Sequence, residues 1–321
     1  MTSATTRNQS TTRDAETRER VVVAVDASDQ SLGAALWGAA EASRLGLPLQ
    51  LVCAVPYPAV RGDPESAELD PDQRRELESI AQTVKERAEV LPLEVRSGPA
   101  LNTVLSQVDD RTRCLVLGHR DQDGARRVLT GSMSIAIAGR SPVPVVVVPD
   151  GWEPGRHGSA PVVVGVDLRL EGETVVGDPE VLQAAFERAR GSHVPLVAVH
   201  AWEIPPLLSW SPSDIQRFRA RANAEFGSFL GPWRADYPEV TVDARAVAER
   251  PSDAVTEASG VAQLVVVGRH TPASRHGGFH LGSTARMVLH HVKVPVMVVP
   301  SPATAGADHP PEHVDKWAPM Y

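Results

Sequence analysis

The chain contains two copies of one sequence pattern, and this repeat limits the folds open to it more than any other feature. Four landmarks occur in the same order in both copies: a valine run ending in aspartate (residues 21–26 and 162–167), an apolar run ending in glycine (115–118 and 265–268), a Gly-Ser pair (131–132 and 282–283) and a Val-Pro run (143–149 and 294–300). The copies are offset by 141 residues at the first landmark (26 to 167) and by 150 or 151 at the others (118 to 268, 131 to 282). Ordered landmarks at a nearly constant offset indicate a tandem duplication, and 321 residues is the length of about two domains.

The landmarks divide the chain into five segments. We expect one domain over residues 20–149 and a second over 161–300, joined by a linker at 150–160 where Gly, Pro, Trp and His interrupt any periodicity. Residues 1–19 and 301–321 are polar, and we expect a disordered N-terminal tail and a C-terminal tail there.

Within each copy, short apolar runs alternate with longer segments of helical spacing. The runs of strand length in the first copy are residues 21–25, 49–55, 93–95, 114–117 and 145–148. They are apolar at successive positions, which is typical of parallel strands covered on both faces. The pattern predicts an α/β fold with a doubly wound parallel sheet in each copy, flavodoxin-like or Rossmann-like. Ligands of such sheets bind outside the carboxyl ends of the strands.

The residues at this edge of the first copy have the composition of a phosphate cradle. Asp26 ends the first strand, Ala54 the second, and Leu117 and Gly118 the fourth. The following loop contains Arg120 and Asp121 and leads to Gly131, Ser132 and Met133, which we expect to open the fourth helix. Glycines let the backbone approach an anion closely, and a helix start offers N–H groups. The alternative is purely structural: Gly118 ends a strand and Ser132 caps a helix.

The second copy places similar residues at the equivalent edge. They are Asp167, Ala201, Val267, Gly268, Gly282, Ser283 and Thr284. The loops of both copies are also rich in arginine, at positions 120, 126, 127, 269 and 275. These side chains either meet phosphate oxygens or form a solvated basic face.

Several other kinds of site are disfavoured. The sequence has no Gly-x4-Gly-Lys-Ser/Thr motif, which excludes a P-loop. His276 and His280 are separated by two glycines that interrupt the helix a zinc pair would need, so we predict no metal site. Ser28, Ser132 and Ser283 lack the surroundings of a nucleophile, and we expect them to cap helices. His290 and His291 are expected to complement the end of a helix.

Composition and charge limit the kinds of partner that we expect the chain to bind and the cell compartment in which we expect it. The formal net charge is −8 and the isoelectric point about 5.8, which disfavours a nucleic-acid surface. We expect no membrane association, because no apolar run approaches the ~20 residues of a membrane helix. The polar N-terminus lacks the apolar region of a signal peptide, so we expect a cytoplasmic protein. Cys53 and Cys114 fall in the second and fourth strands with the first between them, too far apart for a disulfide, and are expected to be reduced core residues.

The residues at these strand ends resemble those of a known family. The first strand with its turn (Val-Ala-Val-Asp26-Ala-Ser28-Asp-Gln-Ser31), the strand ending in His200-Ala201-Trp202, the loop from Gly118 to Gly131-Ser132 and the closing run up to Pro149 are similar to hallmarks of the universal stress protein family. The resemblance covers about residues 20–149 and 160–300 and is to tandem members from high-GC bacteria. It implies that Asp26 and Asp167 contact the adenosine end of ATP. It also implies that the backbone near Ala54 and Ala201 reads the adenine, and that the glycine loops hold the ribose and phosphates.

Both copies depart from the family's pattern of Gly-x2-Gly-x9-Gly-(Ser/Thr). In the first copy the outer glycines have the right spacing, but Asp121 replaces the middle glycine. We expect its carboxylate to repel the phosphates, unless Mg²⁺ bridges them. In the second copy the outer glycines are one residue further apart and Thr271 takes the middle position, and Asp167 is followed by Leu168 and Arg169. The second copy has therefore diverged further.

The resemblance implies a cytoplasmic stress-response regulator that binds ATP, with or without Mg²⁺, at least in the first copy. No general base is evident, so we expect no catalytic residues and at most a slow ATPase. The family likeness further implies that the two domains pair through their last strands, that the chain forms a homodimer, and that it acts on a protein partner of unknown identity. The main alternative is a nucleotide-free dimeric scaffold whose two ATP sites have decayed. A metabolic enzyme such as an adenylating transferase would need an added substrate domain.

Overall fold

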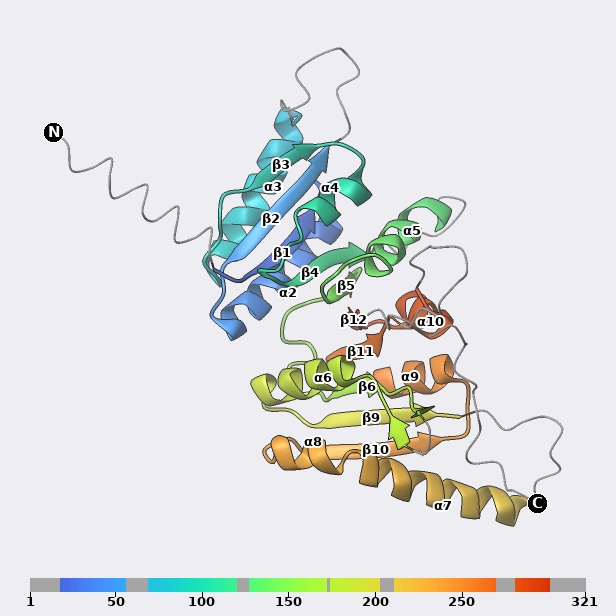
Figure 1. Ribbon diagram of the computed structural model, residues 1–321. Coiled ribbons are helices and arrows are strands. Elements are labelled where there is room, and N and C mark those ends of the chain that lie inside the picture. Colours follow the sequence, from blue (N-terminus) through green and yellow to red (C-terminus); the bar gives the residue numbers. More distant parts are fainter. Residues whose placement is uncertain are drawn as a thin grey trace. The chain divides into compact units, whose positions relative to one another are not determined.

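The computed structural model describes residues 18–55, 69–119, 127–171, 174–202, 211–269 and 281–300 of the chain. These residues form two compact units, unit 1 over residues 1–154 and unit 2 over residues 155–321 (Figure 1). The division falls inside the segment 150–160. The expected tails lie almost entirely outside the described residues.

Unit 1 contains a parallel sheet with helices packed on it. Its strand order is β3 (Glu94–Ser97), β2 (Leu49–Val55), β1 (Arg20–Val25), β4 (Thr112–His119), β5 (Val145–Pro149). The described helices of this unit are α2 (Asp29–Leu45), α3 (Pro71–Lys85), α4 (Ala100–Ser106) and α5 (Arg127–Ala138). The central position of β1 makes its carboxyl end the middle of one sheet edge.

Unit 2 repeats this architecture. Its parallel strands are ordered β10 (Val242–Val247), β9 (Leu196–Ala201), β6 (Val162–Gly165), β11 (Leu264–Gly268), β12 (Val296–Val299). The helices are α6 (Pro179–Ser192), α7 (Pro212–Phe229), α8 (Gly231–Asp236), α9 (Pro251–Ser259) and α10 (Ser283–His291). The prediction of a doubly wound parallel α/β sheet in each copy is confirmed.

Unit 2 also contains an element that the sequence pattern did not predict. Strands β7 (Arg169–Glu171) and β8 (Thr174–Val176) pair antiparallel as a separate hairpin between β6 and α6. Both strands have three residues, which is too short for an alternating pattern to stand out.

The core of unit 1 is built by valines on β1 and small residues on α2. Val21, Val22 and Val23 are fully buried, because neighbouring strands and helices cover both faces of this central strand. Helix α2 lies so close to β1 that a Cβ atom at Gly38 would come within 2.4 Å of Val23 Cγ2. Leu32, near the start of α2, is 37% exposed, since the packed face of this helix is formed by alanines, Trp37 and Gly38.

Helix boundaries follow local capping chemistry in several places. The Asp70 carboxylate accepts a hydrogen bond from Asp72 N at the start of α3, and Pro71 occupies the first helical position. Gly46 ends α2 in the left-handed conformation, with a φ of 66°. Leu77, Ile80 and Val84 form the buried face of α3.

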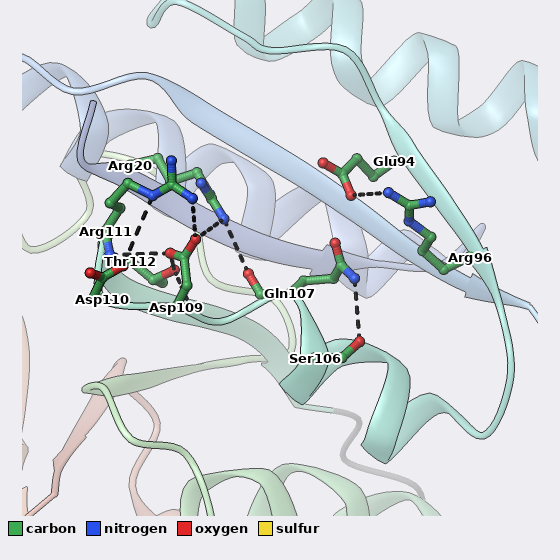
Figure 2. Close-up of polar contacts among 9 residues, drawn as sticks. All are labelled: Arg20, Glu94, Arg96, Ser106, Gln107, Asp109, Asp110, Arg111 and Thr112. Atoms are coloured by element: carbon green, nitrogen blue, oxygen red, sulfur yellow. Dashed lines mark hydrogen bonds and ion pairs between the residues drawn. The ribbon is translucent and has the colours of Figure 1, made fainter. Parts of the chain in front are cut away.

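The last strand at one end of each sheet carries an ion pair between residues two apart. On β3, Arg96 Nη2 lies 3.3 Å from Glu94 Oε2, and on β10, Arg245 Nη2 lies 2.7 Å from Asp243 Oδ2 (Figure 2 shows the pair on β3). Residues two apart on a strand point to the same face of the sheet. Each of these strands therefore presents charge on one face.

Candidate functional site

The carboxyl edge of unit 1 brings together the three strand ends that the sequence singled out. Val25 pairs with Cys53 on one side, and Ala24 pairs with Leu117 on the other. One residue further along each strand, Asp26 follows β1 between Ala54 of β2 and the end of β4. Gly118 lies inside β4 rather than after it, since it pairs with Val148 of β5.

The side chain of Asp26 is held by two serines at the start of α2. Ser31 Oγ donates to Asp26 Oδ1 at 2.7 Å, and the Asp26 N–H donates to Ser31 Oγ at 2.8 Å. The Ser28 hydroxyl also donates to Asp26 Oδ1. Ser28 is the N-cap residue of α2, as expected, but its side chain makes no capping hydrogen bond, because its hydroxyl donates to Asp26 two residues earlier. Sequence reasoning missed the role of Ser31, although its place five residues after Asp26 was visible.

The pKa of the Cys53 thiol depends on both its burial in the core and the charge of this carboxylate. Burial raises its pKa to about 11, and the negative charge of Asp26 adds to the shift. Cys53 is level with Val25, whereas Cys114 is level with Val21 at the other end of β1. Both side chains are buried thiols, as expected from their strands.

The fourth helix of unit 1 begins earlier than the sequence suggested. Helix α5 starts at Arg127, so Gly131, Ser132 and Met133 lie within it, and the predictions that they open the helix and that Ser132 caps it are wrong. The backbone continues helically because residues 127–130 (Arg-Val-Leu-Thr) contain neither proline nor glycine to stop it. Arg120 and Asp121 lie outside the described residues.

A serine on α5 that sequence reasoning missed contacts the strand end. Ser134 is buried, and its Oγ donates to the Gly118 carbonyl oxygen at 3.5 Å. Met133, one residue earlier, is 37% exposed. The buried face of α5 thus lies against the end of β4, close to Gly118.

The equivalent edge of unit 2 also brings its predicted residues together. Gly268 pairs with Val299 at the end of β11, and Val267 pairs with Val298. The Gly282 N–H donates to the Arg269 carbonyl oxygen at 3.0 Å, which joins the two ends of the loop between them. Helix α10 begins at Ser283 and its N-cap is Gly282, so the prediction that Ser283 caps this helix is wrong. Thr284 is half-buried in the first turn.

The two copies differ most in the segment after each aspartate. Helix α2 begins three residues after Asp26 (26 to 29), whereas α6 begins twelve residues after Asp167 (167 to 179). The β7–β8 hairpin occupies the difference and returns at Gly177. A Cβ atom there would lie 3.5 Å from the Asp167 carbonyl oxygen and 2.9 Å from Phe229 Cζ, so the returning chain packs directly on both.

Aromatic side chains pack at the carboxyl end of β9 in unit 2. His200 is buried, and its Nδ1 lies 3.1 Å from the Val166 carbonyl oxygen, which makes Nδ1 the donor in the neutral ring. Burial lowers the pKa of His200, against smaller opposing effects of this hydrogen bond and of Asp167. The rings of His200 and Phe226 are 5.7 Å apart, and those of Trp202 and Phe218 are 4.2 Å apart. Ala201 lies between His200 and Trp202 in the sequence.

A charged side chain also lies at the carboxyl edge of unit 2. Burial lowers the pKa of the half-buried Arg269 guanidinium, which follows β11. Across the part of the chain that the structure describes, no group of three or more His, Cys, Asp or Glu side chains could hold a metal ion. His276 and His280 fall outside that part. His291 Nδ1 lies 2.8 Å from the Met287 carbonyl oxygen in the last turn of α10, consistent with a role at the helix end.

A second polar cluster lies at the opposite, amino-terminal edge of unit 1. Asp109 accepts hydrogen bonds from Arg20 Nη2 at 3.2 Å, Arg111 Nη2 at 3.0 Å and Thr112 Oγ1 at 3.1 Å (Figure 2). Burial alone would raise the pKa of Asp109, but Arg20, Thr112 and Arg111 together lower it. These hydrogen bonds fasten the start of β1 to that of β4, and we therefore assign this cluster a structural role.

The carboxyl edge of unit 1 offers a hydrogen-bond acceptor, the Asp26 carboxylate. A carboxylate held in place accepts hydrogen bonds from ligand hydroxyl or amino groups. Gly118 next to it lets another group approach the backbone.

Among the described helices, none is long and apolar enough to cross a membrane.

Comparisons with known proteins give one consistent result. The family model described as "Universal stress protein family" matches residues 17–149 and 160–300. A universal stress protein of Mycobacterium tuberculosis H37Rv is 31% identical over 319 residues, covering 89% of this chain and 96% of the relative. A second from the same strain is 32% identical over 299 residues, covering 87% and 96%. The crystal structure of a universal stress protein from Archaeoglobus fulgidus is similar in fold, with a TM-score of 0.60 and 16% identity, covering 91% of this chain and 98% of the other.

Proposed function

Because this chain belongs to the universal stress protein family, matched over both of its halves, we propose that it binds ATP at the carboxyl edge of unit 1 and acts as a regulatory module in the stress response. The adenosine end of the nucleotide contacts Asp26, and the backbone near Ala54 faces the adenine. Gly118 and the loop after it, including Arg120 and Asp121, take the ribose and phosphates. ATP binding in turn changes the protein's conformation or its affinity for a protein partner.

The single observation that carries this proposal is the environment of Asp26. Its carboxylate follows the central strand and is held by Ser28 and Ser31 beside Ala54 and Gly118. Holding the acceptor before the ligand arrives lowers the conformational entropy lost on binding. The edge matches where ligands bind in open parallel sheets.

The equivalent site in unit 2 has features that we expect to lower its affinity for ATP. The chain returning from the β7–β8 hairpin packs on the Asp167 backbone. The aromatic pairs of His200 with Phe226 and of Trp202 with Phe218 lie at the end of β9. We therefore propose that ATP binds to unit 1 more tightly than to unit 2.

Titration calorimetry of the full chain with ATP, with and without Mg²⁺, tests the proposal. Asp26→Ala should weaken ATP binding about tenfold or more, by loss of hydrogen bonds to a charged acceptor. Asp167→Ala, the matched change in unit 2, should have a smaller effect. An equal or reversed effect contradicts the ranking of the two units. Absence of ATP binding by the unmodified chain contradicts the proposal and favours the nucleotide-free scaffold.

Assembly forms a separate part of the proposal. We propose that the two domains pair through their last strands, β5 and β12, and that chains associate as homodimers. Limited proteolysis within residues 150–160, followed by size-exclusion chromatography, tests the pairing. Two fragments that elute together support it, and two that separate contradict it.

A further inference from the structure

We propose that Ser31 is a positioning residue for the nucleotide site, which it serves by fixing the carboxylate of Asp26 in one orientation. This inference rests on the proposed binding of ATP to unit 1. It assigns a function to a residue that does not itself need to touch the ligand.

The hydrogen bonds of Ser31 form a closed clamp on one residue. Its hydroxyl donates to Asp26 Oδ1 at 2.7 Å and accepts from the Asp26 N–H at 2.8 Å. A hydroxyl can serve as one donor and accept through its lone pairs, so a single oxygen ties the side chain of Asp26 to its own backbone. Rotation of the Asp26 carboxylate would break the donated bond. The clamp therefore selects one side-chain conformation.

The position of Ser31 makes this clamp rigid. Ser31 is the third residue of α2 and its N–H donates to the Ser28 carbonyl oxygen at 3.0 Å, within the first helical turn. It is only 5% exposed, so water competes little for its hydroxyl. Ser28, in contrast, lies before the helix and is half-buried, so its hydroxyl holds the carboxylate from a position that water reaches more easily. We therefore assign the main positioning role to Ser31 and a lesser one to Ser28.

Both hydroxyls donate to the same carboxylate oxygen, Oδ1. Because both bonds go to Oδ1, together they fix the orientation of the carboxylate plane relative to the edge of the sheet. In unit 2 the positions two and five residues after Asp167 are Arg169 and Gly172, which have no hydroxyl. The same clamp cannot form there, which agrees with the lower affinity proposed for unit 2.

The test is a double-mutant cycle on ATP binding by the full chain. Ser31→Ala should weaken ATP binding about fivefold to tenfold, at unchanged stoichiometry, because the carboxylate must then be ordered when the ligand binds. In an Asp26→Asn background the same change should have little further effect. Ser31→Thr keeps the hydroxyl and should restore most of the affinity. Ser28→Ala serves as the matched control that removes one hydroxyl from the same oxygen, and should weaken binding about twofold.

The outcomes separate this inference from the proposed function. If the unmodified chain binds ATP and Asp26→Asn weakens it, but Ser31→Ala does not, the positioning role is overturned while ATP binding stands. If Ser31→Ala weakens binding equally in the Asp26→Asn background, Ser31 acts independently of Asp26 and the inference fails. A Ser31→Ala protein with a lower melting temperature and a reduced number of sites per chain, but an unchanged Kd, also overturns it. The amide exchange rate of Asp26, measured by NMR without nucleotide, should rise in Ser31→Ala.

Discussion

Two glycines on the same helix should respond in opposite directions to the same substitution. At Gly38 an added Cβ atom would lie 2.4 Å from Val23 Cγ2 and 3.3 Å from Leu49 Cδ1. Val23 belongs to the central strand, is fully buried and has a β-branched side chain with few alternative rotamers, so it cannot move aside. At Gly33 the nearest atom would be the Trp152 carbonyl oxygen at 3.7 Å, an ordinary contact.

The expected magnitudes follow from these two environments. Replacing glycine by alanine inside a helix favours the helix by about 1 kcal/mol. Inserting a methyl group into a well-packed core costs about 1–3 kcal/mol. Gly33→Ala should therefore stabilise unit 1 by up to about 1 kcal/mol, because only the helical term applies. A contact of 2.4 Å places the steric cost of Gly38→Ala in the upper half of that range, about 2–3 kcal/mol. After the helical gain of about 1 kcal/mol, Gly38→Ala should destabilise unit 1 by about 1–2 kcal/mol, because α2 must move away from β1.

Urea unfolding of the full chain measures the change in the free energy of unfolding for both variants. Because two units can unfold separately, hydrogen exchange by mass spectrometry on peptides from α2 and β1 should accompany it and locate the change in unit 1. Gly38→Ala should speed exchange in those peptides, and Gly33→Ala should slow it. A Gly38→Ala protein as stable as the Gly33→Ala protein would refute the claim that close packing of α2 on β1 requires glycine.

Three further predictions concern charge and reactivity. The pKa of His200 is lower in the folded protein than in the unfolded chain, so the unfolded chain binds the proton first and stability should fall as the pH drops below about 6.5. Between pH 8 and pH 5 the urea midpoint of His200→Asn should fall less than that of the unmodified chain. An identical fall in the two proteins would contradict this. Cys53, with a pKa of about 11 and a buried side chain, should react with iodoacetamide at pH 8 only when the chain unfolds, whereas modification of the folded protein, followed by mass spectrometry, would count against the burial of this thiol. Asp121→Gly should tighten ATP binding several-fold in the absence of Mg²⁺ and tighten AMP binding less, since like charge near the phosphates is removed; unchanged or weaker ATP binding in calorimetry would mean that Asp121 faces away or holds the metal.

Much of the fold could be predicted because its main signals are local and occur twice. The valine runs that form β1 and β6 are continuous and apolar, which distinguishes buried parallel strands from amphipathic ones. Proline at the start of α3, α6 and α9 marks where those helices begin. The edge on which Asp26 and Gly118 meet followed from the general rule that parallel sheets bind ligands at their carboxyl ends.

The features that could not be predicted depend on contacts between distant residues. The hairpin β7–β8 is too short to show a period, and only its packing on Phe229 gives it a defined position. The early start of α5 was missed because the Gly-Ser pair looked like a helix start, while the preceding residues are compatible with a helix as well. The clamp made by Ser31 requires knowledge of the first turn of α2, since a serine at that spacing has many alternative partners.

The ion pairs on β3 and β10 oppose the addition of another strand to that end of each sheet. A strand at the end of a sheet offers a row of backbone N–H and C=O groups to which any extended peptide can add. Arg96 with Glu94, and Arg245 with Asp243, would have to be brought against an incoming strand and partly lose their water. The two copies thus carry the same kind of ion pair on equivalent terminal strands, β3 and β10. Where unfolded chains are abundant, a terminal strand without such charges would be a template on which they could grow.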